Sequence, residues 1–156
     1  MTISKRAQKF QELLGERGLD LTVLELPDST RTADDAARAL GCEKAQIVKS
    51  LVFRTPTDDP VMVLASGPNR VNEQTIATLL GTEIGKADAD YVKRVTGYSI
   101  GGVPPLGHKE PLTILVDQDL LEFPEVWAAA GTPNAVFRIP APLTAILAEH
   151  TVVSVL

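Results

Sequence analysis

Two segments of this chain carry residue types suited to chemistry: an apolar strand that contains a lysine, and a loop rich in glycine and proline. The strand spans residues 47–53 (IVKSLVF) and includes Lys49, while the loop spans residues 101–108 (GGVPPLGH). A lysine among apolar neighbours needs a compensating partner, because burial of an unpaired ammonium is costly. Glycine leaves backbone amides unshielded, and proline stiffens the chain around them. Together the segments predict a pocket that receives an anionic or ester-like group.

The lysine has two interpretations. Strand alternation places Lys49 on the same face as Leu51 and Phe53. Its stem either reaches to the sheet edge or its ammonium pairs with one of the 20 acidic residues, which would be a purely structural role. Alternatively, Lys49 lines a cleft, where its three N–H donors anchor a phosphate or ribose group or stabilise charge on an ester oxygen.

The loop also has two interpretations, since glycine and proline are the usual composition of a tight surface turn. Alternatively, Gly101 and Gly102 turn consecutive amides toward one point and form an oxyanion hole, with Pro104 in its stiff wall. Gly107 closes the loop. His108 is either a surface or capping residue, or it positions a substrate group. The second role is possible because the ordinary pKa of histidine suits proton transfer.

Two further polar segments are candidates for the border of the same cleft. The loop of residues 66–70 (SGPNR) either only turns the chain into the next helix or presents Asn69 and Arg70 to a ligand. Asp117 directly follows an apolar strand and either orients a ligand amine or caps the next turn.

Composition limits the function classes. The 156 residues are predicted to form one domain over residues 1–156, and a net charge of −5 argues against a broad duplex-binding surface, so any nucleic-acid contact is expected to be local. One cysteine and two histidines without zinc-ligand spacing predict no metal, and no cofactor is expected. Short apolar runs and a polar start predict a cytoplasmic protein without a membrane span. We expect no triad hydrolase, dinucleotide enzyme or NTPase.

Periodicity and capping residues predict an α/β or α+β domain with a mixed sheet. Thr32 is expected to cap the start of a helix that ends at Gly41, and the strands at 47–54 and 61–66 are expected to form a hairpin. The other predicted helices cover residues 4–17, 72–80, 87–95 and 141–149. The other predicted strands cover residues 21–26, 112–116, 126–129, 135–139 and 151–155.

Three segments in order, residues 47–53, residues 96–108 (TGYSIGGVPPLGH) and residues 125–134 (EVWAAAGTPN), resemble the YbaK family of prolyl-tRNA-editing-like aminoacyl-tRNA deacylases. The similarity covers most of the chain. It implies a freestanding domain similar to the editing insertion of bacterial prolyl-tRNA synthetase. The implied fold is a mixed, largely antiparallel, barrel-like sheet flanked by helices.

The resemblance also implies an activity: hydrolysis, by water, of the ester that joins a wrong amino acid to tRNA. Lys49 is then the key site residue, and Gly101 and Gly102 lie near the scissile carbonyl and the terminal adenosine. The implied partners are the tRNA acceptor end and an aminoacyl-tRNA synthetase. An aminoacyl ester is already activated, so water positioned by backbone dipoles and the vicinal hydroxyl suffices. The predicted substrate contacts are Thr30, Ser50, Asn69, Arg70, Pro104, Gly107, His108 and Asp117.

Two other functions fit the same residues. One is a non-catalytic module that binds an aminoacyl or nucleotide group in association with a synthetase. The other is a small-molecule esterase unrelated to tRNA, which the acidic net charge permits. No release of amino acid from mischarged tRNAs would favour the binding module, and equal activity on free amino-acid esters and charged tRNA would favour the esterase.

Overall fold

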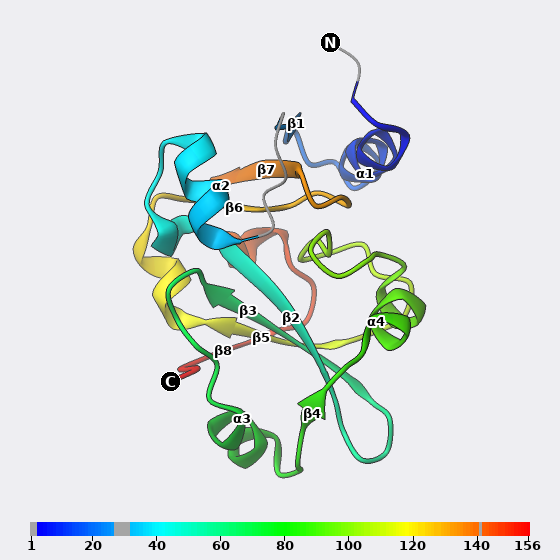
Figure 1. Ribbon diagram of the computed structural model, residues 1–156, viewed down its shortest axis with the longest axis vertical. Helices are drawn as coiled ribbons and strands as arrows, with labels where there is room; N and C mark the ends of the chain where they lie inside the picture. Colours follow the sequence, from blue (N-terminus) through cyan, green and yellow to red (C-terminus); the bar gives the residue numbers. More distant parts are fainter. Residues whose placement is uncertain (1–2, 27–31, 141) are drawn as a thin grey trace.

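The chain folds into two sheets with four α-helices around them, as the computed structural model shows for residues 3–26, 32–140 and 142–156 (Figure 1). The helices are α1 (Lys5–Glu16), α2 (Ala33–Leu40), α3 (Glu73–Leu80) and α4 (Ala89–Thr96), with 3-10 helices η1 (Lys44–Gln46), η2 (Gln118–Glu122) and η3 (Leu143–Ile146). The strands are β1 (Val23–Glu25), β2 (Val48–Arg54), β3 (Pro60–Ser66), β4 (Gly85–Lys86), β5 (Thr113–Asp117), β6 (Glu125–Ala129), β7 (Ala135–Pro140) and β8 (Thr151–Val153).

The smaller sheet has the order β1-β7-β6 and is antiparallel throughout. The larger sheet has the order β4-β2-β3-β5-β8; its β2–β3 and β2–β4 pairs are antiparallel, whereas β3–β5 and β5–β8 are parallel. The predicted mixed α/β architecture and the β2–β3 hairpin are therefore confirmed. The two sheets do not close into a barrel.

The predicted helix over residues 141–149 is wrong over most of its length. Only η3 forms there, between the proline at 142 and the extended segment that leads into β8. The prolines at 140 and 142 remove backbone donors, and pairing of β8 with β5 requires extended backbone soon afterwards. Position 141 itself lies outside the described residues.

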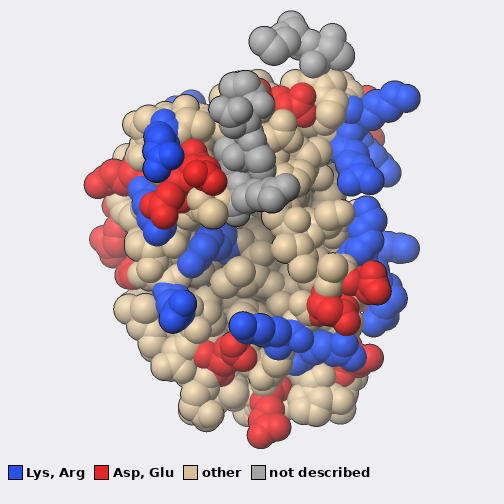
Figure 2. Space-filling view, in the orientation of Figure 1, with Lys and Arg blue, Asp and Glu red and all other residues tan. Residues whose placement is uncertain are grey.

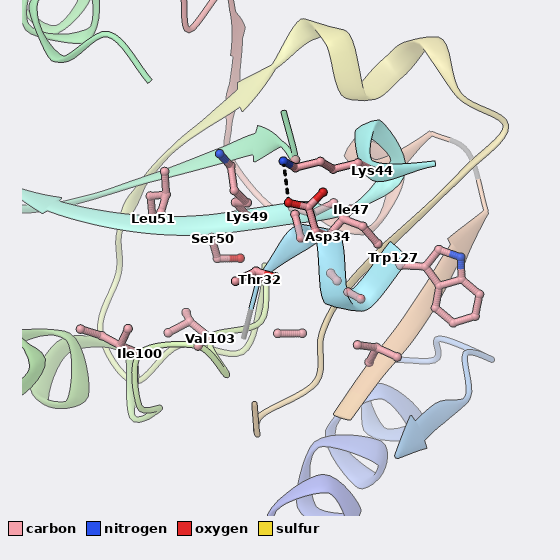
Figure 3. Close-up of a pocket in the computed structure, with 18 residues that line it drawn as sticks. Thr32, Asp34, Lys44, Ile47, Lys49, Ser50, Leu51, Ile100, Val103 and Trp127 are labelled. Carbon is pink, nitrogen blue, oxygen red and sulfur yellow. Dashed lines mark hydrogen bonds and ion pairs between the residues drawn. The ribbon is translucent and has the colours of Figure 1, made fainter. Parts of the chain in front are cut away.

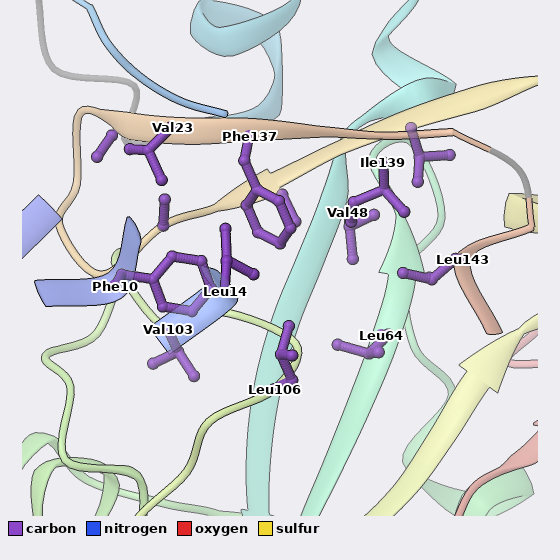
Figure 4. Packing of buried hydrophobic residues seen from close by; sticks show 14 of the residues in the cluster. Phe10, Leu14, Val23, Val48, Leu64, Val103, Leu106, Phe137, Ile139 and Leu143 are labelled. Atoms are coloured by element: carbon purple, nitrogen blue, oxygen red, sulfur yellow. The ribbon is translucent and has the colours of Figure 1, made fainter. Parts of the chain in front are cut away.

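The main core lies between the two sheets and includes one face of α1 (Figure 4). The ring centroids of Phe10 and Phe137 are 5.2 Å apart, and Tyr98 packs edge-on against Phe10 at 6.4 Å. Val103 and Leu106, from the glycine and proline loop, are buried in the same core. Each such burial stabilises the fold by about 1.5–3 kcal/mol, so the loop is anchored by its own side chains.

The ends of the helices follow the sequence signals. The side chain of Asp88 accepts a hydrogen bond from the N–H of Tyr91 and caps α4, and Gly97 ends it with a φ of 84°. Gly97 therefore ends α4 four residues before the glycine loop, with a left-handed backbone that glycine tolerates. No helix in the described part of the chain is both long and apolar enough to span a bilayer.

Candidate functional site

Two adjoining cavities lie beside β2, with volumes of about 420 and 780 Å³. Both volumes are in the range of small-ligand sites. The cavities share a wall made by β2, η1, the loop after β3 and the glycine loop, and Figure 3 shows the smaller one. The shared residues are Lys44, Lys49, Ser50, Leu51, Gly67, Ile100, Gly101 and Val103.

The cavities follow an open edge of β2. On its side away from β3, β2 pairs with β4 only at Phe53 and Arg54, so no described strand covers residues 48–52 there. Side chains from both faces of β2 can therefore border the same space. In Figure 3 the side chain of Lys49 leaves one face, whereas Ser50 leaves the other and points toward the loop that carries Ile100 and Val103.

Lys49 is held by a backbone carbonyl. Its Nζ donates to the oxygen of Asn69 at 2.6 Å, and it forms no ion pair with a carboxylate among the described residues. Burial lowers the pKa of Lys49, the cation of Lys44 lowers it further, Asp117 acts in the opposite direction, and Arg70 also lowers it. The site therefore concentrates positive charge that an anionic ligand would neutralise.

Asp117 organises the loop that binds Lys49. It is only 1% exposed, and its Oδ2 accepts from the N–H of Ser66 at 3.0 Å and from Nδ2 of Asn69 at 2.8 Å. The carboxylate of Asp119 accepts from the same Asn69 amide at 2.7 Å. Asp117 lines neither cavity. Its observed contacts fix the Asn69 loop, instead of orienting a ligand amine directly.

Ser50 has an unusual environment. Its Oγ is buried and has no hydrogen-bond partner among the described residues. A buried hydroxyl without a partner costs about 1–3 kcal/mol. The hydroxyl points into the space next to the glycine loop (Figure 3), where a ligand group could satisfy it.

The two glycines of the loop differ in role. Gly101 is exposed, has a φ of 94° and lines both cavities. Gly102 is buried, and its N–H donates to the carbonyl of Ser99 at 3.0 Å. A Cβ on Gly102 would lie 2.9 Å from the backbone of Thr132. The predicted pair of consecutive free amides is therefore not formed, because the turn itself uses the amide of Gly102.

Pro104, Gly107 and His108 line neither of the two cavities. His108 donates from Nε2 to the carbonyl oxygen of Pro104 at 2.7 Å, and burial lowers the pKa of its ring. Gly107 has a φ of 81°, and a Cβ there would lie 2.9 Å from Leu13. These residues hold the shape of the loop.

Residues 97–101 (GYSIG) have the spacing of the serine elbow of triad hydrolases. In the structure this segment follows α4, whereas the elbow requires a sharp turn from a strand into a helix. Ser99 is exposed at the start of the loop, and the next regular element is β5. The segment therefore lacks the geometry of a nucleophile elbow.

The other predicted residues divide between the cavities. Asn69 and Arg70 line the larger one, and the segment 125–134 supplies Trp127, Ala128 and Ala129 to the smaller one. Thr30 lies outside the described residues, although Thr32 nearby lines the smaller cavity. The described residues contain no cluster of three or more potential metal ligands.

Sequence reasoning missed Ile100 as a wall residue. Its side chain is 57% exposed and borders both cavities. An isoleucine directly before two glycines, in a loop otherwise expected at the surface, was the available signal. Lys44 was one of several scattered cations in the sequence, and only the fold brings it beside Lys49.

The chain matches the family model of the aminoacyl-tRNA editing domain over residues 27–145. A proline–tRNA ligase from Limosilactobacillus fermentum is 38% identical over 125 residues, which cover 76% of this chain and 22% of that protein. The chain thus spans about a fifth of that ligase. YwhH, an uncharacterised protein of Bacillus subtilis, is 28% identical over 117 residues, covering 75% of this chain and 74% of that one.

Among solved structures, one described as a proposed trans-editing enzyme for prolyl tRNA synthetase is 44% identical. It superposes with a TM-score of 0.91 and covers 98% of each chain. The resemblance carried by the three sequence segments is thereby confirmed, and it extends over the whole fold. The chain belongs to the aminoacyl-tRNA editing domain family.

Proposed function

We propose that this protein acts in trans as an aminoacyl-tRNA deacylase, which hydrolyses the ester between a wrong amino acid and the 3′ end of tRNA. The observation that carries the proposal is that Lys49 and Gly101, from distant segments, line the same two cavities. Family membership supports the editing chemistry, and the similarity to a protein described as a proposed trans-editing enzyme supports action as a separate chain.

The lining residues suggest which part of the substrate binds in which cavity. The smaller cavity has several alanines and Trp127 among its lining residues, and this mainly apolar wall suits an aminoacyl side chain. The larger cavity has Lys49, Asn69 and Arg70, which suit the terminal ribose, its phosphate and the base. The ester then lies at the shared wall, near Ser50 and Gly101.

The reaction needs no protein nucleophile. Water adds to the ester carbonyl, the negative charge of the tetrahedral intermediate is stabilised by nearby donors, and the bond from the carbonyl carbon to the ribose oxygen breaks. The ribose oxygen takes up a proton, and the amino acid leaves as a carboxylate. The exposed amide of Gly101 and the cation of Lys49 are the candidate donors, while the vicinal ribose hydroxyl positions the water.

A binding module without activity is the second candidate. The observation that favours it is that, among the described residues, no free carboxylate or histidine lines the wall shared by the two cavities: Asp34 in the smaller cavity pairs with Lys44 at 3.1 Å, and Glu73 lines only the larger one. A panel of mischarged tRNAs separates the two candidates. Release of amino acid from any tRNA supports the deacylase, whereas tight binding without release supports the module. Equal rates on free amino-acid esters would favour a general esterase.

A further inference from the structure

We propose that a third cavity, separate from the two described above, binds phosphate groups of an RNA backbone. It has a volume of about 370 Å³ and lies between α1, the end of α4 and the glycine loop. Arg6, Lys9, Lys93 and Lys109 line it, and none of its lining residues is acidic. The inference rests on the proposed function, because it concerns the RNA that carries the ester.

The charge at this cavity is positive, whereas the net charge of the whole chain is negative. The net charge is −5, yet four cations from three segments meet here. Figure 2 shows Lys and Arg side chains gathered over α1 and α4 along one edge of the molecule. Acidic residues of the same elements, Glu12, Glu16, Asp90 and Glu110, do not line the cavity.

The cations are free to bind a ligand. None of the four forms an ion pair in the described part of the chain, and Lys93 reaches only the carbonyl of Gly97, at 3.4 Å. Arg6, Lys9, Lys93 and Lys109 are all exposed. Positive side chains left without carboxylate partners around a concave surface suit phosphate oxygens, which accept several donors at once.

The cavity also contains a fixed aromatic side chain. Tyr98 is half-buried, and its ring packs edge-on against Phe10 with a centroid distance of 6.4 Å. Burial raises the pKa of Tyr98, and the nearby cation of Arg17 acts in the opposite direction. The phenol therefore stays protonated and can donate to a phosphate oxygen, and its position costs little entropy on binding.

The glycine loop connects this cavity with the proposed active site. The third cavity is lined by residues just before the loop, Gly97 and Tyr98, and by residues at its end, Gly107 and Lys109, whereas Gly101, the first residue of the loop, lines the other two. A 3′ end bound at Gly101 would leave the preceding backbone close to the same loop. This continuity favours RNA over an acidic protein as the partner.

The test compares two double variants. Lys9→Gln/Lys109→Gln removes two cations of the cavity, and Arg38→Gln/Arg138→Gln removes two exposed cations that line none of the three cavities. Binding of uncharged tRNA is measured by fluorescence anisotropy between 50 and 200 mM salt, the range in which phosphate contacts are strongly salt-dependent. We expect the cavity variant to bind about tenfold more weakly and to lose about 2 from the slope of log affinity against log salt.

Hydrolysis of an aminoacyl ester of adenosine, which has no stem, should stay unchanged in the cavity variant. Equal weakening of tRNA binding in both double variants would overturn the proposal, and so would displacement of tRNA by polyglutamate at matched charge. If wild-type protein releases no amino acid from any tRNA, the proposed function fails while the binding comparison still decides the role of the cavity. A cavity variant that binds tRNA normally and releases amino acid from mischarged tRNA at the wild-type rate would contradict this inference alone.

Discussion

The ammonium of Lys49 lies 2.6 Å from the carbonyl oxygen of Asn69, and the amide of Asn69 in turn donates to the buried carboxylate of Asp117. The cation of the site is thus tied to the core of the larger sheet through one loop. Because the carbonyl uses one of three N–H donors, two donors of Lys49 are available to a substrate.

Replacement of this cation should abolish most of the activity. Lys49→Ala is expected to lower the rate of amino-acid release from mischarged tRNA by about 100-fold or more, the usual effect of losing one donor to a developing oxyanion. The free energy of unfolding should fall by only about 1 kcal/mol, because the hydrogen bond to the carbonyl of Asn69 is lost but Lys49 has no carboxylate partner among the described residues. Single-turnover hydrolysis and urea denaturation measure the two quantities.

Lys44→Ala is the matched control. Lys44 lines the same cavities, but its ammonium already pairs with the exposed Asp34 at 3.1 Å. Its loss should change the rate only a few fold. Equal losses in both variants would mean that general positive charge matters and that Lys49 has no special role.

Ser50→Ala tests whether the unpartnered hydroxyl serves the substrate. Removing a buried hydroxyl that has no partner should leave the protein equally stable or about 1 kcal/mol more stable. If the hydroxyl bonds to substrate, kcat/KM should fall about tenfold, which corresponds to one neutral hydrogen bond. Denaturation and steady-state kinetics on the same sample give both values.

Ser66→Ala provides the contrast for that variant. The hydroxyl of Ser66 donates to the carbonyl of Ala45 at 2.7 Å, so its loss should cost about 1 kcal/mol of stability. The substitution lies outside both cavities and should leave KM unchanged. A Ser50→Ala protein that is destabilised with normal kinetics would assign Ser50 a purely structural role.

Replacing glycines by alanine should change the stability of the protein by amounts that depend on the room for the new Cβ and on the backbone angle φ. Gly102→Ala is expected to cost about 2–3 kcal/mol, because the new Cβ would lie 2.9 Å from the backbone of Thr132. Gly101→Ala has room but must adopt a φ of 94°, which costs about 1–2 kcal/mol. Gly15→Ala, in α1 with open space around it, should stabilise by about 0.5–1 kcal/mol. Thermal denaturation of the three variants gives the order, and a Gly102→Ala protein as stable as wild type would contradict the packing.

His108 should make the protein less stable in mild acid. Burial lowers the pKa of its ring below the ordinary value of 6.5, so the unfolded chain binds more protons as the pH falls through that value. The free energy of unfolding therefore decreases below about pH 6.5 and stops decreasing once the folded protein is also protonated. Urea denaturation at a series of pH values between about 7.5 and 5, a range that brackets the ordinary pKa of histidine, measures this decrease.

His108→Gln should reduce that pH dependence, because the amide keeps a donor for the carbonyl of Pro104 but does not titrate. His150→Gln is the control, since His150 is only partly buried and its exposed hydrogen bond goes to the nearby carbonyl of Ala148. If both variants keep the wild-type slope, the acid sensitivity arises from carboxylates elsewhere.

Much of the architecture follows from local signals. The hairpin of β2 and β3 follows from two apolar runs joined by a short loop that contains Pro56, and α4 follows from Asp88 and Gly97 at its ends. The segment after Pro140 carried a helical pattern as well. There the long-range pairing of β8 with β5 outweighed it, so a short 3-10 turn formed instead.

The sequence by itself determined the family and the two segments that meet at the site, because both depend on the type and order of residues such as Lys49 and Gly101, which can be read without a structure. Only the tertiary structure decided that Ser50 is left without a partner, that the amide of Gly102 is used inside its own turn, and that Asp117 acts through Asn69. Hydrogen-bond partners and free surfaces depend on which distant segments pack together. The sequence determines those contacts only through the free energy of the complete fold, to which all segments contribute.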